Sequence, residues 1–144
     1  MVDAALDRLL TRGPDSNFER WFGTPTPENV EHVKQVLSNI QHALAHDVST
    51  LVAGQGANDH EVAHVHPDAP YQITLTPLAF SHAGGSNSLE STLVHEFSHF
   101  TNIGGTHDQS YGPQNDRLLA MTNSRAAVNN ADNYGMFIGA YGGG

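Results

Sequence analysis

The sequence predicts one α+β domain that is mostly helical, with a small β-sheet and one helix that carries candidate metal ligands. Three features support this prediction: apolar residues at helical spacing, short extended segments between positions 49 and 76, and the pattern His95-Glu96-Phe97-Ser98-His99. The 144 residues, of which 38% are hydrophobic, suffice for a single core, and no repeat or linker divides them. We therefore expect residues 1–144 to form one domain.

Two helices are expected in the first third of the chain. The first covers residues 2–12 and ends at Gly13-Pro14, and its apolar residues are Leu6, Leu9 and Leu10. The second begins at Thr26-Pro27-Glu28-Asn29, with proline at a favoured first helical position, and continues to about Asp47. Its apolar face consists of Val30, Val33, Val36, Leu37, Ile40 and Leu44.

Short strands and further helical segments are expected after this point. The extended pieces lie near 49–53, 61–66 and 71–76. The helical segments cover 88–100, about 114–122 and 125–138. Strands in one block and helices around it predict the α+β class.

The helix expected at 88–100 carries the strongest chemical signal. At about 100° per residue, His95 and His99 lie about 40° apart, so two imidazoles can bind one cation with Glu96 beside them. Asn87 or Ser88 can cap the helix, and Gly104-Gly105 ends it. The histidines lie opposite an apolar stripe made of Leu89, Leu93, Phe97 and Phe100. We interpret the pattern as a zinc peptidase site.

A second match to the same pattern is His60-Glu61-Val62-Ala63-His64. Glycines precede it, and Pro67 and Pro70 follow it, so about six residues remain for a helix. The alternation of Val62, His64 and His66 with Ala63 and Val65 suits a strand better than a helix. It places His64 and His66 on one face of that strand. A role for these two histidines in substrate contact is one interpretation, and a plain packed or exposed pair is the other.

Composition narrows the classes of function. There are no cysteines, which excludes disulfides, cysteine nucleophiles and thiolate metal sites, and the 10 histidines are the natural ligands for zinc. The net charge of −9 argues against nucleic acid and anionic membranes as partners and favours cationic substrates, although solubility alone also explains it. The sequence contains no apparent signal peptide and no transmembrane segment, and a monomer is expected.

A catalytic zinc site needs a third protein ligand. A third histidine six residues after His99 is excluded because Gly105 stands there, and no Glu follows Glu96. The acids that remain downstream are Asp108, Asp116 and Asp132. Asp108 is nearest and follows a glycine turn, and its neighbour His107 competes with it because adjacent extended residues point in opposite directions.

The stretch Gly105-Thr106-His107-Asp108-Gln109-Ser110-Tyr111-Gly112, taken with the histidine motif, resembles the aspzincin peptidases. Members carry Gly-Thr-x-Asp-x-x-Tyr-Gly after the histidine helix, and every fixed position matches. The likeness extends to Arg20-Trp21-Phe22-Gly23 and Asn130-Ala131-Asp132-Asn133, and covers roughly residues 20–140. It implies a zincin-like fold, Asp108 as third ligand of one Zn²⁺ ion, a protein or peptide substrate, and secretion. The lysine-specific branch is the most similar.

This ligand set suggests a mechanism. Zinc polarises a water, Glu96 takes its proton and delivers it to the leaving amine, and Tyr111 donates to the oxyanion. The role of Tyr111 rests on the resemblance and on the chemistry of a neutral phenol donor. Thr106 and Asn102 are candidates for supporting the ligands.

Specificity for lysine is suggested by the resemblance. In lysine-specific relatives two acids a turn apart on the late helix bind the lysine that follows the cut. Asp132 matches the first acid, whereas Gly135 stands at the second, and Asp116 is a candidate for the missing charge. The chain contains one lysine, Lys34, which fits resistance to self-cleavage and fits genomic base composition equally well.

Two other classes of function stay open at this point. One is a zinc-binding module without turnover, closed by a fourth ligand such as His107. The other is a peptidase delivered as a toxin with a narrow substrate range. Glu96 and Tyr111 argue against the module, because a structural zinc site needs neither residue.

Overall fold

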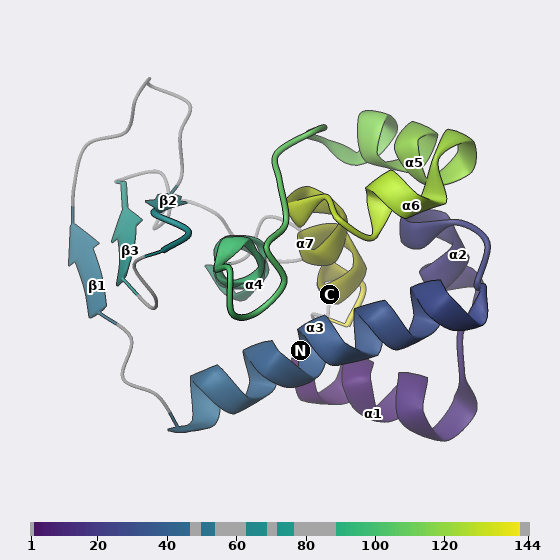
Figure 1. Cartoon of the computed structure of the whole chain (residues 1–144), viewed down its shortest axis with the longest axis horizontal. Helices are drawn as coiled ribbons and strands as arrows, with labels where there is room; N and C mark the ends of the chain where they lie inside the picture. The colour runs from purple at the N-terminus through teal and green to yellow at the C-terminus, as the bar shows by residue number, and fades with distance from the viewer. Residues whose placement is uncertain (1, 47–49, 54–62, 69–71, 77–88, 142–144) are drawn as a thin grey trace.

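The long helix α3 (Pro27–His46) forms one side of the fold and begins where the sequence predicts. In the computed structural model, α1 (Val2–Arg12) packs against it (Figure 1). Leu6 and Leu9 of α1 and most of the predicted face of α3 are buried. The prediction is wrong at the margins of both stripes, since Leu10 is 59% exposed and Leu44 is 43% exposed. These side chains extend past the surface that the neighbouring elements cover.

The structure describes residues 2–46, 50–53, 63–68, 72–76 and 89–141. Helix α3, the three strands and the helix that carries the histidine motif fall within these ranges, whereas positions 47, 49, 61–62, 71 and 88 at the ends of the predicted segments do not. None of the helices described is both long enough and apolar enough to cross a membrane.

The sequence does not predict the short helix α2 (Ser16–Phe22). Its start is fixed by Asp15, whose Oδ1 accepts a hydrogen bond from the amide of Phe18 at 3.1 Å. Gly23 ends it at φ +79°, and a Cβ there would collide with the carbonyl oxygen of Ala120. Seven residues are too few to display a helical period, and so the cap and the terminal glycine are its clearest signals.

Three predicted strands form one small sheet at the far end of the molecule from α2 (Figure 1). Their order is β1 (Thr50–Ala53), β3 (Gln72–Leu75), β2 (Ala63–Val65), with β1 parallel and β2 antiparallel to β3. His64 pairs with Thr74 in this register. The strand interpretation of the second histidine motif is therefore confirmed at positions 63 and 64, while positions 60–62 lie outside the described residues.

Helix α4 (Leu89–His99) lies between the sheet and α7 (Ala131–Gly139), and it packs on α7 more extensively than on any other described element (Figure 1). Phe97 and the following Phe100 are buried as predicted, but Leu89 is exposed and Val94 takes its place in the core. The proposed caps Asn87 and Ser88 lie outside the described residues.

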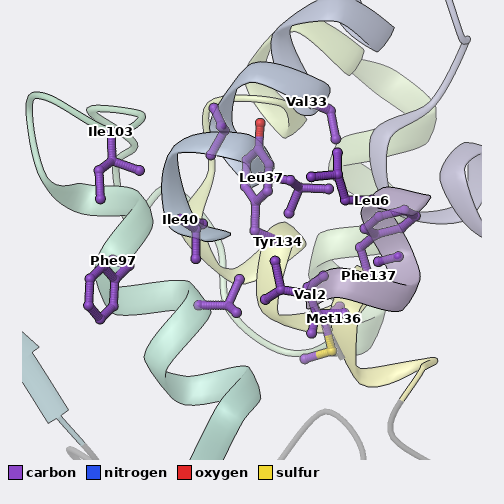
Figure 2. Packing of buried hydrophobic residues seen from close by; sticks show 14 of the residues in the cluster. Val2, Leu6, Val33, Leu37, Ile40, Phe97, Ile103, Tyr134, Met136 and Phe137 are labelled. Atoms are coloured by element: carbon purple, nitrogen blue, oxygen red, sulfur yellow. The ribbon is translucent and has the colours of Figure 1, made fainter. Parts of the chain in front are cut away.

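The last third contains α5 (Pro113–Thr122), α6 (Ser124–Ala127) and α7, so the single helix predicted at 125–138 is in fact two. The chain turns after α6 at Val128, and Asn130 then takes an extended conformation and forms a β-bridge with His107. Figure 2 shows how Tyr134 and Phe137 of α7 reach the core beside Leu37 and Leu6. This anchoring fixes α7 beside α4.

Candidate metal centre

One turn of α4 presents both histidines of the first motif on the same side. The ring centroids of His95 and His99 are 5.1 Å apart, with an interplanar angle of 72°. Both side chains are largely buried, at 13% and 10% exposure. The spacing of four residues on a helix therefore produces the pair of imidazoles that the sequence predicts.

A glycine turn folds the chain back over α4. The amides of Gly104 and Gly105 both donate to the carbonyl oxygen of Phe100, and Gly105 has φ +57°. The amide of Thr106 then donates to the carbonyl oxygen of Ser98 at 3.0 Å. A Cβ on Gly104 would lie 2.9 Å from that same oxygen, so this close approach requires glycine.

The returning segment is attached to the start of α7. His107 exchanges backbone hydrogen bonds with Asn129 and Ala131, each at 2.9 Å. The side chain of Asn130, which is fully buried, accepts from the amides of Gln109 and Ser110 at 2.7 and 3.1 Å. The backbone on both sides of Asp108 is therefore held in place.

This arrangement brings Asp108 to both histidines. Its Oδ1 lies 3.1 Å from Nε2 of His95 and 3.0 Å from Nε2 of His99. Among the described residues these three form the group whose ligand atoms could hold one metal ion. His107, the competing candidate, is exposed and is not a member of that group.

The donor set fits zinc. Two imidazole nitrogens and one carboxylate oxygen are ligands of catalytic zinc, and a tetrahedral ion separates its ligand atoms by about 3.3 Å. The two nitrogen-to-oxygen distances of 3.0 and 3.1 Å are within a few tenths of an ångström of that separation.

The other ring nitrogens fix the tautomers. Nδ1 of His99 lies 2.9 Å from the carbonyl oxygen of Thr106, and Nδ1 of His95 lies 3.1 Å from Oδ1 of Asp132. Both partners are acceptors, so both Nδ1 atoms carry hydrogen and both Nε2 atoms keep a lone pair when the rings are neutral. The main-chain carbonyl of Thr106 therefore supports the site, with the Thr106 hydroxyl a longer 3.5 Å from the same Nδ1, while Asn102, the other candidate, is exposed.

The surrounding carboxylates favour positive charge at this point. Burial lowers the pKa of His95, but hydrogen bonds with Asp108 and Asp132 outweigh burial and raise it to about 10. The pKa of His99 is also raised, because its bonds to Asp108 and Thr106 outweigh burial. Burial raises the pKa of Asp108, but the two histidines hold it far below its usual value. Positive charge is stabilised where the three ligand atoms meet.

Glu96 and Tyr111 both border this group. Glu96 is 7% exposed, and burial raises the pKa of its carboxyl group against the opposing effect of the two histidines. Tyr111 is 57% exposed, and its ring stacks on His95 with centroids 6.1 Å apart. Burial, then the Asp108 carboxylate, raise the pKa of its phenol, which therefore keeps its proton at neutral pH. A buried carboxyl group and a neutral phenol thus stand beside the candidate ligands.

Asp132 lies within the site but is engaged by other groups of the protein. Its side chain is 18% exposed; Oδ1 faces His95, and Oδ2 accepts from the amide of Gly112 at 2.8 Å. Asp116 is fully buried, and its carboxyl group faces that of Asp132. No local sequence pattern predicts these contacts or the support from Asn130, because each contact joins residues that are distant in the chain.

Comparisons with known proteins agree with this geometry. The chain matches the aspzincin family model, described as lysine-specific metallo-endopeptidase, over residues 11–139. It is 35% identical over 121 residues to an extracellular protease of Aeromonas hydrophila, covering 83% of this chain and 34% of that protein. It is 32% identical over 128 residues to a peptidyl-Lys metalloendopeptidase of Pleurotus ostreatus, covering 85% of this chain and 72% of the relative.

A peptidyl-Lys metalloendopeptidase of Armillaria mellea is 34% identical over 132 residues, which cover 85% of this chain and 34% of that protein. The chain thus spans about a third of the length of two of these relatives. Among solved structures, a zinc peptidase from Grifola frondosa matches with a TM-score of 0.89 and 28% identity, covering 97% of this chain and 86% of that one. The predicted α+β peptidase fold is confirmed.

Proposed function

We propose that this chain, which belongs to the aspzincin family, is a zinc-dependent endopeptidase that hydrolyses peptide bonds in proteins or peptides. The observation that carries the proposal is the group of His95, His99 and Asp108, with Glu96 and Tyr111 beside it. Among the described residues this group has three members, which suits a catalytic site with an open position better than a closed structural site.

The role of the metal follows from the donor set. A zinc ion held by these three residues would act as a Lewis acid that polarises a water and the scissile carbonyl group. The remaining chemistry belongs to side chains of the protein.

We assign the proton transfers to Glu96. A carboxylate with a raised pKa is better matched to accepting a proton from water near neutral pH and returning it to the amine that leaves. Its low exposure limits competition from bulk water. Tyr111 would donate from its phenol to the oxygen that becomes negative on the reacting carbonyl group, since the phenol keeps its proton at neutral pH.

We further propose a preference for lysine after the cut, with Asp132 as the acidic group. The relatives named peptidyl-Lys metalloendopeptidases and the low exposure of an ionised Asp132 support this assignment. An ionised carboxylate offers about four acceptor sites, and His95, Gly112 and Asp116 use three of them. The preference is therefore expected to be weaker than that of a pocket with two acids.

Packing restricts position 135, where the second acid would stand. Ser91 donates to the carbonyl oxygen of Gly135 at 2.7 Å, and a Cβ on Gly135 would lie 3.2 Å from Oγ of Ser91. A side chain at this position therefore requires Ser91 to shift by a few tenths of an ångström. We also infer secretion, supported by the relative that is named an extracellular protease.

The test is digestion of an unfolded, lysine-rich protein by the zinc-loaded chain, with cut sites mapped by mass spectrometry. Glu96→Gln is the matched control, because it keeps the shape of the side chain but cannot accept a proton. We expect it to lower kcat/KM by about 10²- to 10⁴-fold while zinc stays bound. Undiminished cleavage by this variant would overturn the mechanism.

The same digest tests specificity. Cuts before lysine at a higher kcat/KM than cuts before alanine or arginine would support the pocket at Asp132. Cleavage without this preference would keep the peptidase and remove the lysine assignment. A wild-type chain that binds zinc and cleaves nothing would favour the module or the narrow-substrate toxin.

A further inference from the structure

Asp116 is a buried carboxyl group that the reaction described above does not use. It lies in the first turn of α5 and has no exposed surface. A buried carboxylate needs hydrogen-bond donors for both oxygens, or it must be neutral. The partners of Asp116 therefore decide which of these forms the protein holds.

The two oxygens of Asp116 have different partners. Oδ1 accepts from the hydroxyl of Ser110 at 2.5 Å. Oδ2 is buried and receives no hydrogen from any donor in the described part of the chain. The carboxyl groups of Asp116 and Asp132 are within hydrogen-bonding reach of each other. Two ionised carboxylates cannot form this bond, because neither has a hydrogen to donate. The contact is complete when one of the two carries a proton.

The contacts of Asp132 show which residue carries it. Both of its oxygens already accept hydrogen, Oδ1 from Nδ1 of His95 and Oδ2 from the amide of Gly112. A carboxylate that accepts hydrogen bonds at both oxygens is held in its ionised form. For Asp116, burial and then Asp132 raise the pKa, while Ser110 and the more distant His95 oppose them.

We propose that Asp116 is a positioning residue that keeps its carboxyl proton and donates it from Oδ2 to Asp132, which holds the Asp132 carboxylate against Nδ1 of His95. The chain of contacts then runs from Asp116 through Asp132 to His95, whose Nε2 faces the metal position. Outer carboxylates of this kind orient a ligating histidine and raise its basicity. This inference rests on the proposed metal site, and it adds a residue that supports the site from α5.

The consequence for the metal site is a matter of charge and geometry. A neutral Asp116 adds a hydrogen bond without adding negative charge beside Asp132, so one carboxylate can stay ionised in a buried position. An ionised Asp116 would repel Asp132 and leave Oδ2 without a donor. The first turn of a helix normally favours negative charge, but burial and the facing carboxylate outweigh that preference here.

The experiment compares the zinc affinities of wild type, Asp116→Asn and Asp116→Ala by competition with a chromophoric chelator. Asparagine is neutral, and its amide can donate to Asp132 while its carbonyl oxygen accepts from Ser110. We expect Asp116→Asn to bind zinc within about threefold of wild type and Asp116→Ala to bind about 10- to 100-fold more weakly. Thermal unfolding of the metal-free variants shows whether each one folds.

Infrared difference spectra provide a readout that a purely structural role would not change. Wild type minus Asp116→Asn should contain the carbonyl-stretch band of a protonated carboxylic acid at neutral pH. Absence of that band, or an asparagine variant that loses zinc as strongly as the alanine variant, would overturn the inference. If Asp116→Ala does not fold, the asparagine variant and the spectrum still decide.

These measurements need no turnover, so they are separate from the test of peptidase activity. Tight zinc binding without cleavage by wild type would contradict the proposed function and leave the role of Asp116 standing. Cleavage by wild type together with weak zinc binding by Asp116→Asn would support the proposed function and contradict the role of Asp116.

Discussion

The two histidines of the metal centre differ in what supports them. His95 and His99 both face Asp108 through Nε2, but Nδ1 of His95 meets the carboxylate of Asp132, whereas Nδ1 of His99 meets the main-chain carbonyl of Thr106. A carbonyl oxygen fixes orientation, and a carboxylate also adds negative charge. The helix α4 therefore presents two similar ligands in unequal electrostatic settings.

The origin of the two supports differs as well. The Thr106 carbonyl is seven residues from His99 and arrives through the glycine turn, so it is a local feature. Asp132 is 37 residues from His95 and arrives through the packing of α7 on α4. The orientation of His99 should therefore depend on the glycine turn, and the orientation of His95 on the packing of α7 against α4.

The largest effect on metal binding is expected from Asp108→Ala, which removes the group that both histidines share. Zinc affinity should fall by more than the roughly 100-fold that loss of an outer support costs. His107→Ala is the matched control, since His107 neighbours Asp108 but is exposed and outside the ligand group. Isothermal titration with Zn²⁺ measures the affinity of both variants. A larger loss of affinity in His107→Ala than in Asp108→Ala would make His107, not Asp108, the third ligand.

A smaller effect is expected from Asp132→Asn, which acts on the His95 side alone. It keeps the size of the side chain but removes the charge at Nδ1 of His95, and its amide nitrogen cannot accept from Gly112. Zinc affinity should fall by about 10- to 100-fold. An affinity equal to that of wild type would show that the two histidines are supported equally.

Proton release on zinc binding sharpens the same comparison. His95 has a pKa raised to about 10, so at pH 7 it is protonated in the metal-free protein. A protonated ring has no lone pair, and zinc must therefore displace this proton, which makes affinity fall as pH is lowered. Titrations at pH 7 in buffers of different ionisation enthalpy count the protons. Asp132→Asn lowers the pKa of His95, so its proton release should begin to fall at a lower pH than that of wild type.

The smallest effect on zinc is expected from Thr106→Ala on the His99 side. The variant loses the buried hydroxyl, which lies 2.7 Å from Oγ of Ser98 and 3.5 Å from Nδ1 of His99, but keeps the carbonyl that accepts from His99 at 2.9 Å. Zinc affinity should stay within about threefold, while the free energy of unfolding falls by about 1 kcal/mol. Loss of zinc comparable to that of Asp132→Asn would mean that the side chain, not the main chain, supports His99.

Sequence by itself determined the features that repeat within one element or one turn. Four-residue spacing on a helix places His95 and His99 together, and two glycines at 104 and 105 return the chain toward Asp108. The apolar face of α3 and the three strands are likewise local patterns. Such features follow from backbone geometry, which a periodic sequence records directly.

Tertiary structure decided the features that join distant elements. It buried Asp116, set Asp132 against His95, and divided the last predicted helix at Asn130 so that this side chain could hold the loop of Asp108. It also left Leu10 and Leu44 exposed at the ends of otherwise buried stripes. The environment of a side chain depends on which helix packs beside it. The spacing of apolar residues along one helix does not indicate which helix that is.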